Sequence, residues 1–247
     1  MTSRREIAWV GAGTRVDRTA PVVISPPLKG IRYYDGNGCC GTSPHTRAML
    51  TIDGERLLAQ RYAIDWVRFD DQGRWVVGDP TVNENYIVFG DPIYAVAPGR
   101  VVSVLTDLPE NTPPTPLADL NTQNALGNHI IQDLGGGRYA LYAHMQPGSI
   151  PAGIGVGSRL ARGQAIGRVG NTGSSTAPHL HFHISDGPDA VGSQGRPYVV
   201  DGFTFTNTVR NPDAVGDELA VADLAPATPP GRRTRQLPLT GDVVDFP

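Results

Sequence analysis

Residues 177–184 read Ala-Pro-His-Leu-His-Phe-His-Ile, and from His179 onward histidine alternates strictly with an apolar side chain. Successive side chains of a strand point to opposite sides, so this pattern predicts a β-strand with one packed face and one presented face. His179, His181 and His183 share the presented face at intervals of roughly 7 Å. The chain has six histidines, and imidazole is both a common metal ligand and a general base. Placing three of them here favours metal or proton chemistry over a strand face that only meets water.

Three further segments accompany the histidine strand in a recognisable order. Tyr142-Ala143-His144 and Gly170-Asn171-Thr172-Gly173 precede it, and Ala63-Ile64-Asp65-Trp66 lies further upstream. Together they resemble the signature segments of the M23 (LytM or lysostaphin-like) zinc metallopeptidases, which are H-x-x-x-D, Y-A-H and G-x-T-G near H-L-H. The resemblance covers about Ile93 to Ile184, with Asp65 upstream of it.

The resemblance implies a groove floored by an antiparallel sheet, with Zn²⁺ on that floor. It makes Asp65 and His181 metal ligands, and it makes His144 and His179 catalytic histidines that do not bind the metal. It also implies a peptidoglycan peptide substrate and a location in the cell envelope or outside the cell. Zinc hydrolases use three protein ligands and leave the fourth position to water, so one protein ligand is still missing.

The missing ligand is the family's first histidine, four residues before the aspartate, where this chain has Arg61. Guanidinium stays protonated in proteins and cannot ligate zinc. In an extended strand Arg61 and Asp65 would share a face, so Arg61 could pair with Asp65 and replace the metal.

The sequence therefore leaves two alternative functions. The chain is either a zinc-dependent endopeptidase that hydrolyses peptide bonds in peptidoglycan stems or cross-bridges, or a catalytically inactive M23-like protein that binds wall peptides or regulates another hydrolase. A dead site has no chemical need for Asp65, His144, His179 and His181 together, which favours the enzyme. Arg61 favours the second function.

We predict His45 as the third metal ligand. It lies in the turn-like segment Ser43-Pro44-His45, close enough in sequence to fold back over the Asp65 strand. The competing interpretation is a solvated loop histidine. The other candidate ligands fit less well. His129 starts a strand that leads away by a tight turn, and His183 lies so close to His181 along the strand that ligation by both would be strained. Cys39 and Cys40 would supply a thiolate, which the family's hydrolytic sites do not use. The adjacent cysteines form a disulfide only with strained geometry, and we interpret them as structural or as half of an unidentified site.

The composition of the chain indicates an all-β fold. Its 247 residues include 30 glycines and 22 prolines, with 7% aromatic residues, which suits short strands joined by turns. We predict a compact antiparallel β-sandwich or barrel-like hybrid of the M23 peptidase type, with long loops. Loop 106–127 is expected at the rim of the groove. The expected strands are residues 21–25, residues 60–69, two strands that flank Pro98-Gly99, the hairpin 128–144 and residues 198–200. In the second strand of the hairpin, alternation predicts Ala140, Tyr142 and His144 on one face.

The chain is predicted to have three parts: an N-terminal arm (1–20), an M23-like peptidase domain with an N-terminal extension (21–205) and an extended C-terminal tail (206–247). The arm carries four arginines but no apolar segment, so no signal peptide is recognisable. A net charge of −3 gives no electrostatic reason to expect nucleic acid or an anionic membrane as partner. No apolar run approaches the ~20 residues of a membrane span.

Overall fold

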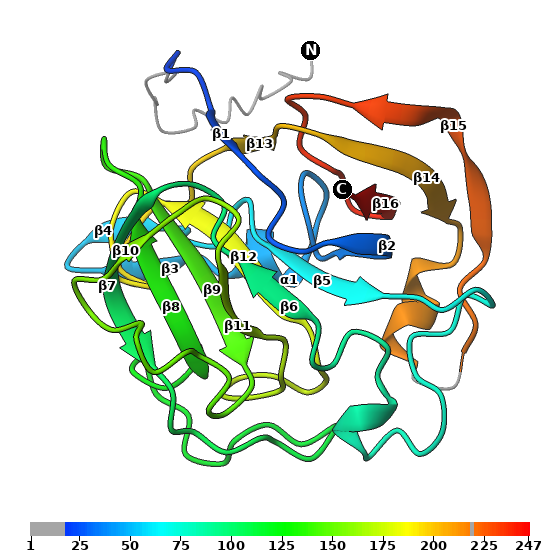
Figure 1. The fold of residues 1–247 in the computed structure, drawn as a ribbon, viewed down its shortest axis with the longest axis horizontal. Helices are drawn as coiled ribbons and strands as arrows, with labels where there is room; N and C mark the ends of the chain where they lie inside the picture. Colours follow the sequence, from blue (N-terminus) through cyan, green and yellow to red (C-terminus); the bar gives the residue numbers. More distant parts are fainter. Residues whose placement is uncertain (1–17, 218–219) are drawn as a thin grey trace, which may run out of the picture.

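A computed structural model describes residues 18–217 and 220–247 of the chain, so residues 1–17 of the predicted N-terminal arm lie outside it. The fold is all-β, as predicted, and centres on a large sheet whose neighbouring strands are all antiparallel (Figure 1). In spatial order the strands of this sheet are β10 (Arg159–Leu160), β7 (Gly99–Leu105), β8 (Asn128–Asp133), β9 (Tyr139–Met145), β12 (Leu180–Ser185), β5 (Ile64–Arg68), β2 (Gly30–Gly36), β16 (Asp242–Phe246), β14 (Phe203–Val209) and β15 (Leu224–Arg233).

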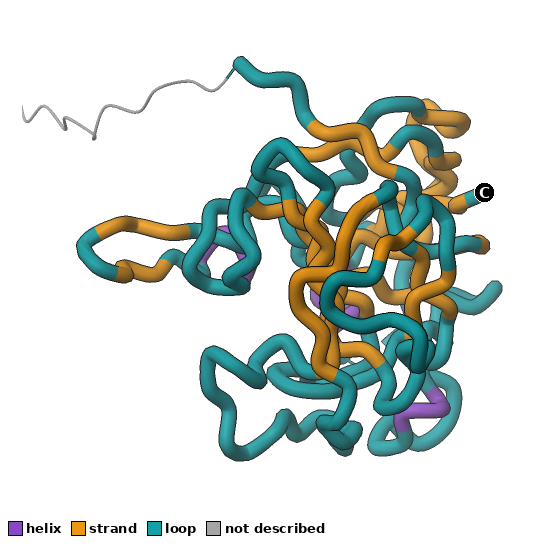
Figure 2. Tube along the Cα trace, turned by 60° about the vertical axis from the view of Figure 1, so that its left-hand side comes forward, coloured by secondary structure: helices purple, strands orange, loops and turns teal. Residues whose placement is uncertain are grey.

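Smaller elements surround this sheet. They are the parallel pair β1 (Val22–Ile24) and β13 (Tyr198–Val200), the antiparallel pairs β6 (Pro92–Tyr94) with β11 (Ala165–Arg168) and β3 (Leu50–Ile52) with β4 (Glu55–Leu57), the helix α1 (Pro44–Arg47) and the 3₁₀ turns η1 (Asn83–Asn85) and η2 (Pro212–Gly216). The β3–β4 hairpin projects from the body beside α1 (Figure 2). Within the described part of the chain, no helix is both long and apolar enough to cross a membrane.

The packed face of β12 forms the centre of the main hydrophobic core. Leu180, Phe182 and Ile184 are fully buried there, together with Trp66 and Tyr142 from the neighbouring strands. Each such side chain contributes roughly 1.5–3 kcal/mol of favourable burial. The alternation in the sequence therefore specifies which face of β12 packs, and it leaves the histidines on the opposite face.

A second apolar cluster packs on the other face of β2 and β5. Tyr34 and Val67 are cross-strand partners in this cluster, and Phe69, Trp75 and Tyr86 join them. Because Trp66 and Asp65 alternate along β5, Trp66 enters the main core while Asp65 points to the same side as the histidines. β5 is thus packed on both faces.

The C-terminal segment is part of the large sheet. β16 lies between β2 and β14, so the boundary predicted at residue 206 falls inside β14. Val244 and Phe246 enter the main core, and the Phe246 ring lies 5.6 Å from that of Tyr33 and 5.2 Å from that of Trp66. Residues 206–247 were expected as an extended tail; they supply the end of β14 and all of β15 and β16, because Val244 and Phe246 complete the core.

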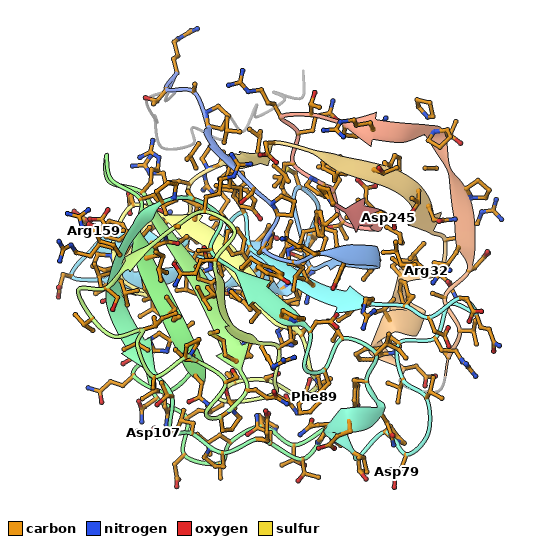
Figure 3. The ribbon with its side chains drawn as sticks, in the orientation of Figure 1. Arg32, Asp79, Phe89, Asp107, Arg159 and Asp245 are labelled. Atoms are coloured by element: carbon orange, nitrogen blue, oxygen red, sulfur yellow. A yellow bond between two sulfur atoms is a disulfide. The ribbon has the colours of Figure 1, made fainter. Side chains whose placement is uncertain are left out.

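The pairing of β2 with β16 contains one irregularity. Arg32 has a φ of +61°, in the left-handed region, and its backbone N–H donates to the Asp245 carboxylate at 2.9 Å (Figure 3). The register of the two strands shifts between Val244 and Phe246. A side-chain acceptor therefore satisfies a backbone donor where the ladder is interrupted.

Candidate metal centre

The site begins with a cross-strand pair. His181 on β12 lies directly opposite Asp65 on β5, and its Nδ1 is 2.9 Å from Asp65 Oδ1. Register and alternation together bring these side chains to one side of the sheet. Sequence reasoning predicted both residues as metal ligands, and the structure brings them together.

His45 reaches the same carboxylate from the short helix α1. Its Nε2 lies 3.2 Å from Asp65 Oδ2, and the side chain is buried. Its Nδ1 is 2.9 Å from the Asn37 carbonyl oxygen and 3.2 Å from that of Ala63. Since carbonyl oxygens can only accept, Nδ1 carries a proton, and Nε2 is the nitrogen that faces Asp65. His45 is therefore not a solvated loop histidine.

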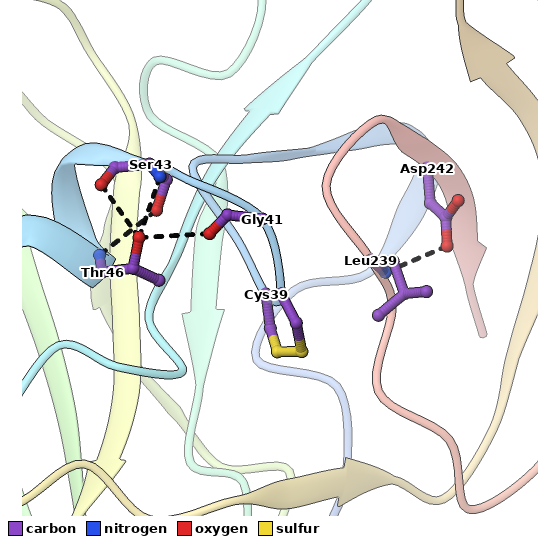
Figure 4. Close-up of a disulfide and its surroundings, with 7 residues drawn as sticks. Cys39, Gly41, Ser43, Thr46, Leu239 and Asp242 are labelled. Atoms are coloured by element: carbon purple, nitrogen blue, oxygen red, sulfur yellow. Dashed lines mark hydrogen bonds between the residues drawn. A yellow bond between two sulfur atoms is a disulfide. The ribbon is translucent and has the colours of Figure 1, made fainter. Parts of the chain in front are cut away.

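Local hydrogen bonds hold α1 in place. Ser43 is the N-cap: its hydroxyl accepts from the Thr46 N–H at 3.3 Å, and its own N–H donates to Thr46 Oγ1 at 2.9 Å (Figure 4). Pro44 occupies the first helical turn, where its missing N–H costs nothing. This reciprocal capping fixes the turn that presents His45.

The loop between β2 and α1 contains Cys39 and Cys40, which are joined in a disulfide (Figure 4). The Cys39 carbonyl accepts from the Thr240 N–H at 3.1 Å, which ties the loop to the segment before β16. The cysteines therefore belong to the frame of the loop, one of the two interpretations left open by the sequence.

Arg61 takes no part in this cluster. The predicted strand 60–69 begins only at Ile64, and Arg61 lies in the exposed turn before it. Because that turn is not extended, Arg61 and Asp65 do not share a face. No hydrogen bond or ion pair joins these two side chains among the described residues. The expected alternative, an Arg61–Asp65 pair in place of the metal, is wrong for this structure.

His144 and His179, predicted as catalytic, lie beside the cluster with their ring centroids 4.7 Å apart. His144 Nδ1 donates to the Thr172 carbonyl at 2.7 Å, and His179 Nδ1 donates to the Ala177 carbonyl at 2.8 Å. Both rings consequently keep Nε2 free of these bonds. His179 Nε2 is 3.4 Å from Asp65 Oδ1.

His144 reaches the site by breaking the alternation of β9. Tyr142 pairs with Phe182 and enters the main core, whereas Ala143 pairs with His181 on the other face. Regular alternation would return His144 to the core, and sequence analysis expected it on the face of Tyr142. That expectation is wrong, because His144 has a φ of +62°. This left-handed conformation is uncommon outside glycine and redirects the side chain.

Two neighbours complete the hydrogen bonding of the cluster. His183 is fully buried, and its Nδ1 lies 3.0 Å from His181 Nε2, which places it where the alternation predicted. Asn37 Nδ2 donates to Asp65 Oδ2 at 2.8 Å. Sequence reasoning missed Asn37, since nothing in a lone asparagine after a strand indicates that it will meet a carboxylate.

The ionisable groups around Asp65 shift one another's pKa values. Burial would raise the pKa of Asp65, but His45 and His179 outweigh it and hold that pKa well below its usual range. Burial would likewise lower the pKa of His45, and the Asp65 carboxylate raises it above the usual value. Burial lowers the pKa of His144 strongly, and His179 and His181 add to this effect. The site thus holds an anionic carboxylate facing several imidazole nitrogens.

The donor atoms fit a zinc ion. The ligand atoms of His45, Asp65 and His181 all lie within 4.8 Å of one another. Zinc–ligand bonds of 2.0–2.1 Å separate tetrahedral ligands by about 3.3 Å. His45 Nε2 lies 3.2 Å from Asp65 Oδ2, and His181 Nδ1 lies 2.9 Å from the other oxygen, Oδ1. His144, His179 and His181 form a second, overlapping group by the same distance measure. Two imidazoles and a carboxylate are a donor set that zinc hydrolases use.

A groove runs through the cluster. Two adjoining hollows share Asn37, Asp65, Thr176 and His179. One is bounded by Thr122, Ala125 and Leu126 of loop 106–127, where a rim loop was expected, and the other by Tyr34, Trp75 and Val215. Asp65 and His179 therefore line both hollows, whereas His45, His144 and His181 line only the hollow beside loop 106–127.

The fold and the site define a β-sheet protein with a candidate metal centre on the floor of a groove. Residues 86–193 match Peptidase family M23. The match agrees with the family resemblance that the motifs predicted. The matched segment contains His144, His179 and His181, whereas His45 and Asp65 come from the preceding part of the chain.

Solved structures show distant similarity. The catalytic domain of the prophage-encoded M23 protein EnpA from Enterococcus faecalis, in a mutant form, is 20% identical, with 74% of this chain and 92% of that chain covered and a TM-score of 0.36. The catalytic domain of the antimicrobial peptidase lysostaphin from Staphylococcus simulans is 22% identical, with 67% and 88% covered and a TM-score of 0.36. A zinc-containing peptidase from Vibrio cholerae is 19% identical, with 53% and 47% covered and a TM-score of 0.29. No curated protein sequence matches the chain.

Proposed function

We propose that this protein is a zinc-dependent endopeptidase that hydrolyses peptide bonds in peptidoglycan stems or cross-bridges. The observation that carries the proposal is the contact of His45 Nε2 with Asp65 Oδ2 at 3.2 Å, together with His181 Nδ1 at 2.9 Å from the other carboxylate oxygen, Oδ1. Acceptor atoms that face one another require a cation between them, either a proton or a metal ion. The match of residues 86–193 to Peptidase family M23 supports a metal ion rather than a proton.

Each side chain has a role in this proposal. His45, Asp65 and His181 would hold a zinc ion, which would act as a Lewis acid and lower the pKa of water so that it can lose a proton at neutral pH. His144, with Nδ1–H fixed on the Thr172 carbonyl, takes the proton from the attacking water at Nε2. His179 faces the same space and stabilises the oxyanion.

His183 and Asn37 position the ligands in this proposal. Donation from His181 Nε2–H to His183 Nδ1 leaves His181 Nδ1 as the unprotonated ligand atom. Asn37 donates to the Asp65 oxygen that also faces His45. These contacts orient the lone pairs without themselves touching the substrate.

The second candidate is a catalytically inactive M23-like protein that binds wall peptides or regulates another hydrolase. The replacement of the family histidine by Arg61 favours it. Against it, His45 lies next to Asp65 and Arg61 lies in an exposed turn. The proposal of an enzyme therefore does not require Arg61 to act in the metal site.

Elemental analysis and a hydrolysis assay test the proposal together. Protein purified without chelator is expected to carry about one zinc per chain and to release peptide fragments from purified peptidoglycan. Chelation should abolish release, and added zinc should restore it. Zinc-free protein after incubation with excess metal would contradict the metal site, while bound zinc without hydrolysis would favour the inactive alternative.

A further inference from the structure

A second cavity lies on the far side of the turn that precedes Asp65. Gln60 lines the metal-site groove, and the next residue, Arg61, lines this cavity of about 650 Å³. Arginines from four separate segments line it: Arg56, Arg61, Arg138 and Arg196. They come from β4, the turn before β5, the β8–β9 hairpin and the segment after residue 193. The tertiary fold, and not a local charge run, brings them together.

The frame of this cavity is held by hydrogen bonds. Gln194 Nε2 donates to the Arg56 carbonyl at 2.7 Å, and Gln194 Oε1 accepts from the Leu58 N–H at 3.2 Å. The Gly195 N–H donates to the Leu58 carbonyl at 3.0 Å. A Cβ at Gly195 would lie 2.6 Å from the Ala59 carbonyl oxygen, so this close approach requires glycine. The segments that carry Arg56, Arg61 and Arg196 are therefore joined.

Among the described residues that line the cavity, arginines have no matching carboxylates. Arg196 Nη2 pairs with Asp186 at 2.9 Å. Arg56, Arg61 and Arg138 have no ion pair with a carboxylate among the described residues, and no Asp or Glu of that part of the chain lines the cavity. The whole chain nevertheless has a net charge of −3. Concentrating guanidinium groups in one hollow of an acidic protein attracts an anion.

We propose that this cavity binds a phosphate group. Guanidinium groups that approach from several segments suit a tetrahedral anion, because its oxygens accept hydrogen bonds in several directions at once. A carboxylate presents two oxygens in one plane and could satisfy fewer of these donors. The site is separate from the metal centre, and it gives Arg61 a role that ligation of zinc cannot.

Titration calorimetry with inorganic phosphate on metal-free protein tests this proposal. Removing the metal prevents phosphate from binding at zinc, so the result does not depend on the proposed peptidase activity. We expect saturable binding that weakens with added salt. Acetate at equal ionic strength should give no comparable signal.

Two variants and a matched control locate the binding. Arg61→Gln and Arg138→Gln are each expected to weaken phosphate binding about tenfold, since each removes a charged donor. Arg159→Gln removes an exposed arginine of β10, which is labelled in Figure 3. Arg159 does not line the cavity, so this variant should bind phosphate like the wild type. Thermal melts confirm that each variant is folded. Absence of phosphate binding, or equal affinity in all three variants, would overturn the proposal.

Discussion

Asp65 is the residue on which the candidate metal centre depends, through its carboxylate. Three histidine nitrogens lie within 3.4 Å of its two oxygens. Backbone carbonyls set the tautomers of His45 and His179, so the direction of each lone pair follows from main-chain geometry. A centre built this way is preorganised, because the rings are oriented before any metal arrives.

His45→Ala is expected to weaken zinc binding by more than the roughly 10–100-fold typical of groups that only support a ligand. The physical reason is the loss of a direct nitrogen donor. Arg61→Gln is the matched control and should bind zinc like the wild type, since Arg61 is exposed and away from Asp65. Competition with a metal-sensitive dye measures both affinities. Unchanged zinc affinity in His45→Ala would exclude His45 as a ligand.

His179→Ala and His181→Ala should separate catalysis from metal binding. We expect His179→Ala to lower the hydrolysis rate by about 10²–10⁴-fold while zinc stays bound. His181→Ala should lose both zinc and activity, because His181 Nδ1 is a proposed ligand atom. Zinc content and initial rates are measured on the same preparations. Equal zinc loss in the two variants would show that the roles are assigned wrongly.

Among the elements, loop 106–127 and the glycine-rich segment before β12 form a joined unit. Asn111 donates to the Gly173 carbonyl at 2.9 Å and to the Ser175 carbonyl at 2.8 Å. Glu110 Oε2 accepts from the Asn171 N–H at 2.6 Å. These bonds hold the rim of the groove against the segment that supplies the Thr172 carbonyl to His144.

Glu110 should make the stability of the protein depend on pH. Burial raises the pKa of Glu110 from its ordinary 4.5 to about 7, so the folded protein holds a proton that the unfolded chain releases. Its stabilising effect is complete below pH 4.5 and is lost as the pH rises through about 7. Glu110→Gln keeps an acceptor for Asn171, and its melting temperature relative to the wild type should rise from pH 5 to pH 8. A constant difference across this range would refute the prediction.

The integrity of the large sheet depends on the C-terminal strand β16. β16 occupies an interior position of the large sheet, where it pairs with both β2 and β14. β2 is in turn the neighbour of β5, which carries Asp65. The C-terminus therefore supports the strand beside the metal centre, although no residue of β16 lies in the centre.

Phe246→Ala should destabilise the protein by about 3–5 kcal/mol, as is typical of a large aromatic side chain deleted from a core. Phe246 is 4% exposed and packs on Tyr33 and Trp66. Val156→Ala is the control: Val156 is 69% exposed and should change stability by less than about 0.5 kcal/mol. Urea unfolding measures both. A small effect of Phe246→Ala would mean that β16 is not part of the cooperative core.

Local patterns in the sequence were sufficient for the all-β fold, the histidine strand and the hairpin 128–144, because alternation within a strand specifies its packed face. The expectation that Asp65 and His181 meet came from the resemblance to the M23 family. Local patterns were also sufficient to propose His45, although its ligation of zinc stays a prediction. Three features were not predicted from local patterns: the left-handed conformation of His144, the position of Arg61 outside β5, and the insertion of β16 between β2 and β14. His144 and β16 are held by contacts between residues far apart in the chain, which strand periodicity does not reveal. The turn at Arg61 is closed by local bonds, from the Arg61 N–H to the Leu58 carbonyl and from the Ala63 N–H to the Gln60 carbonyl.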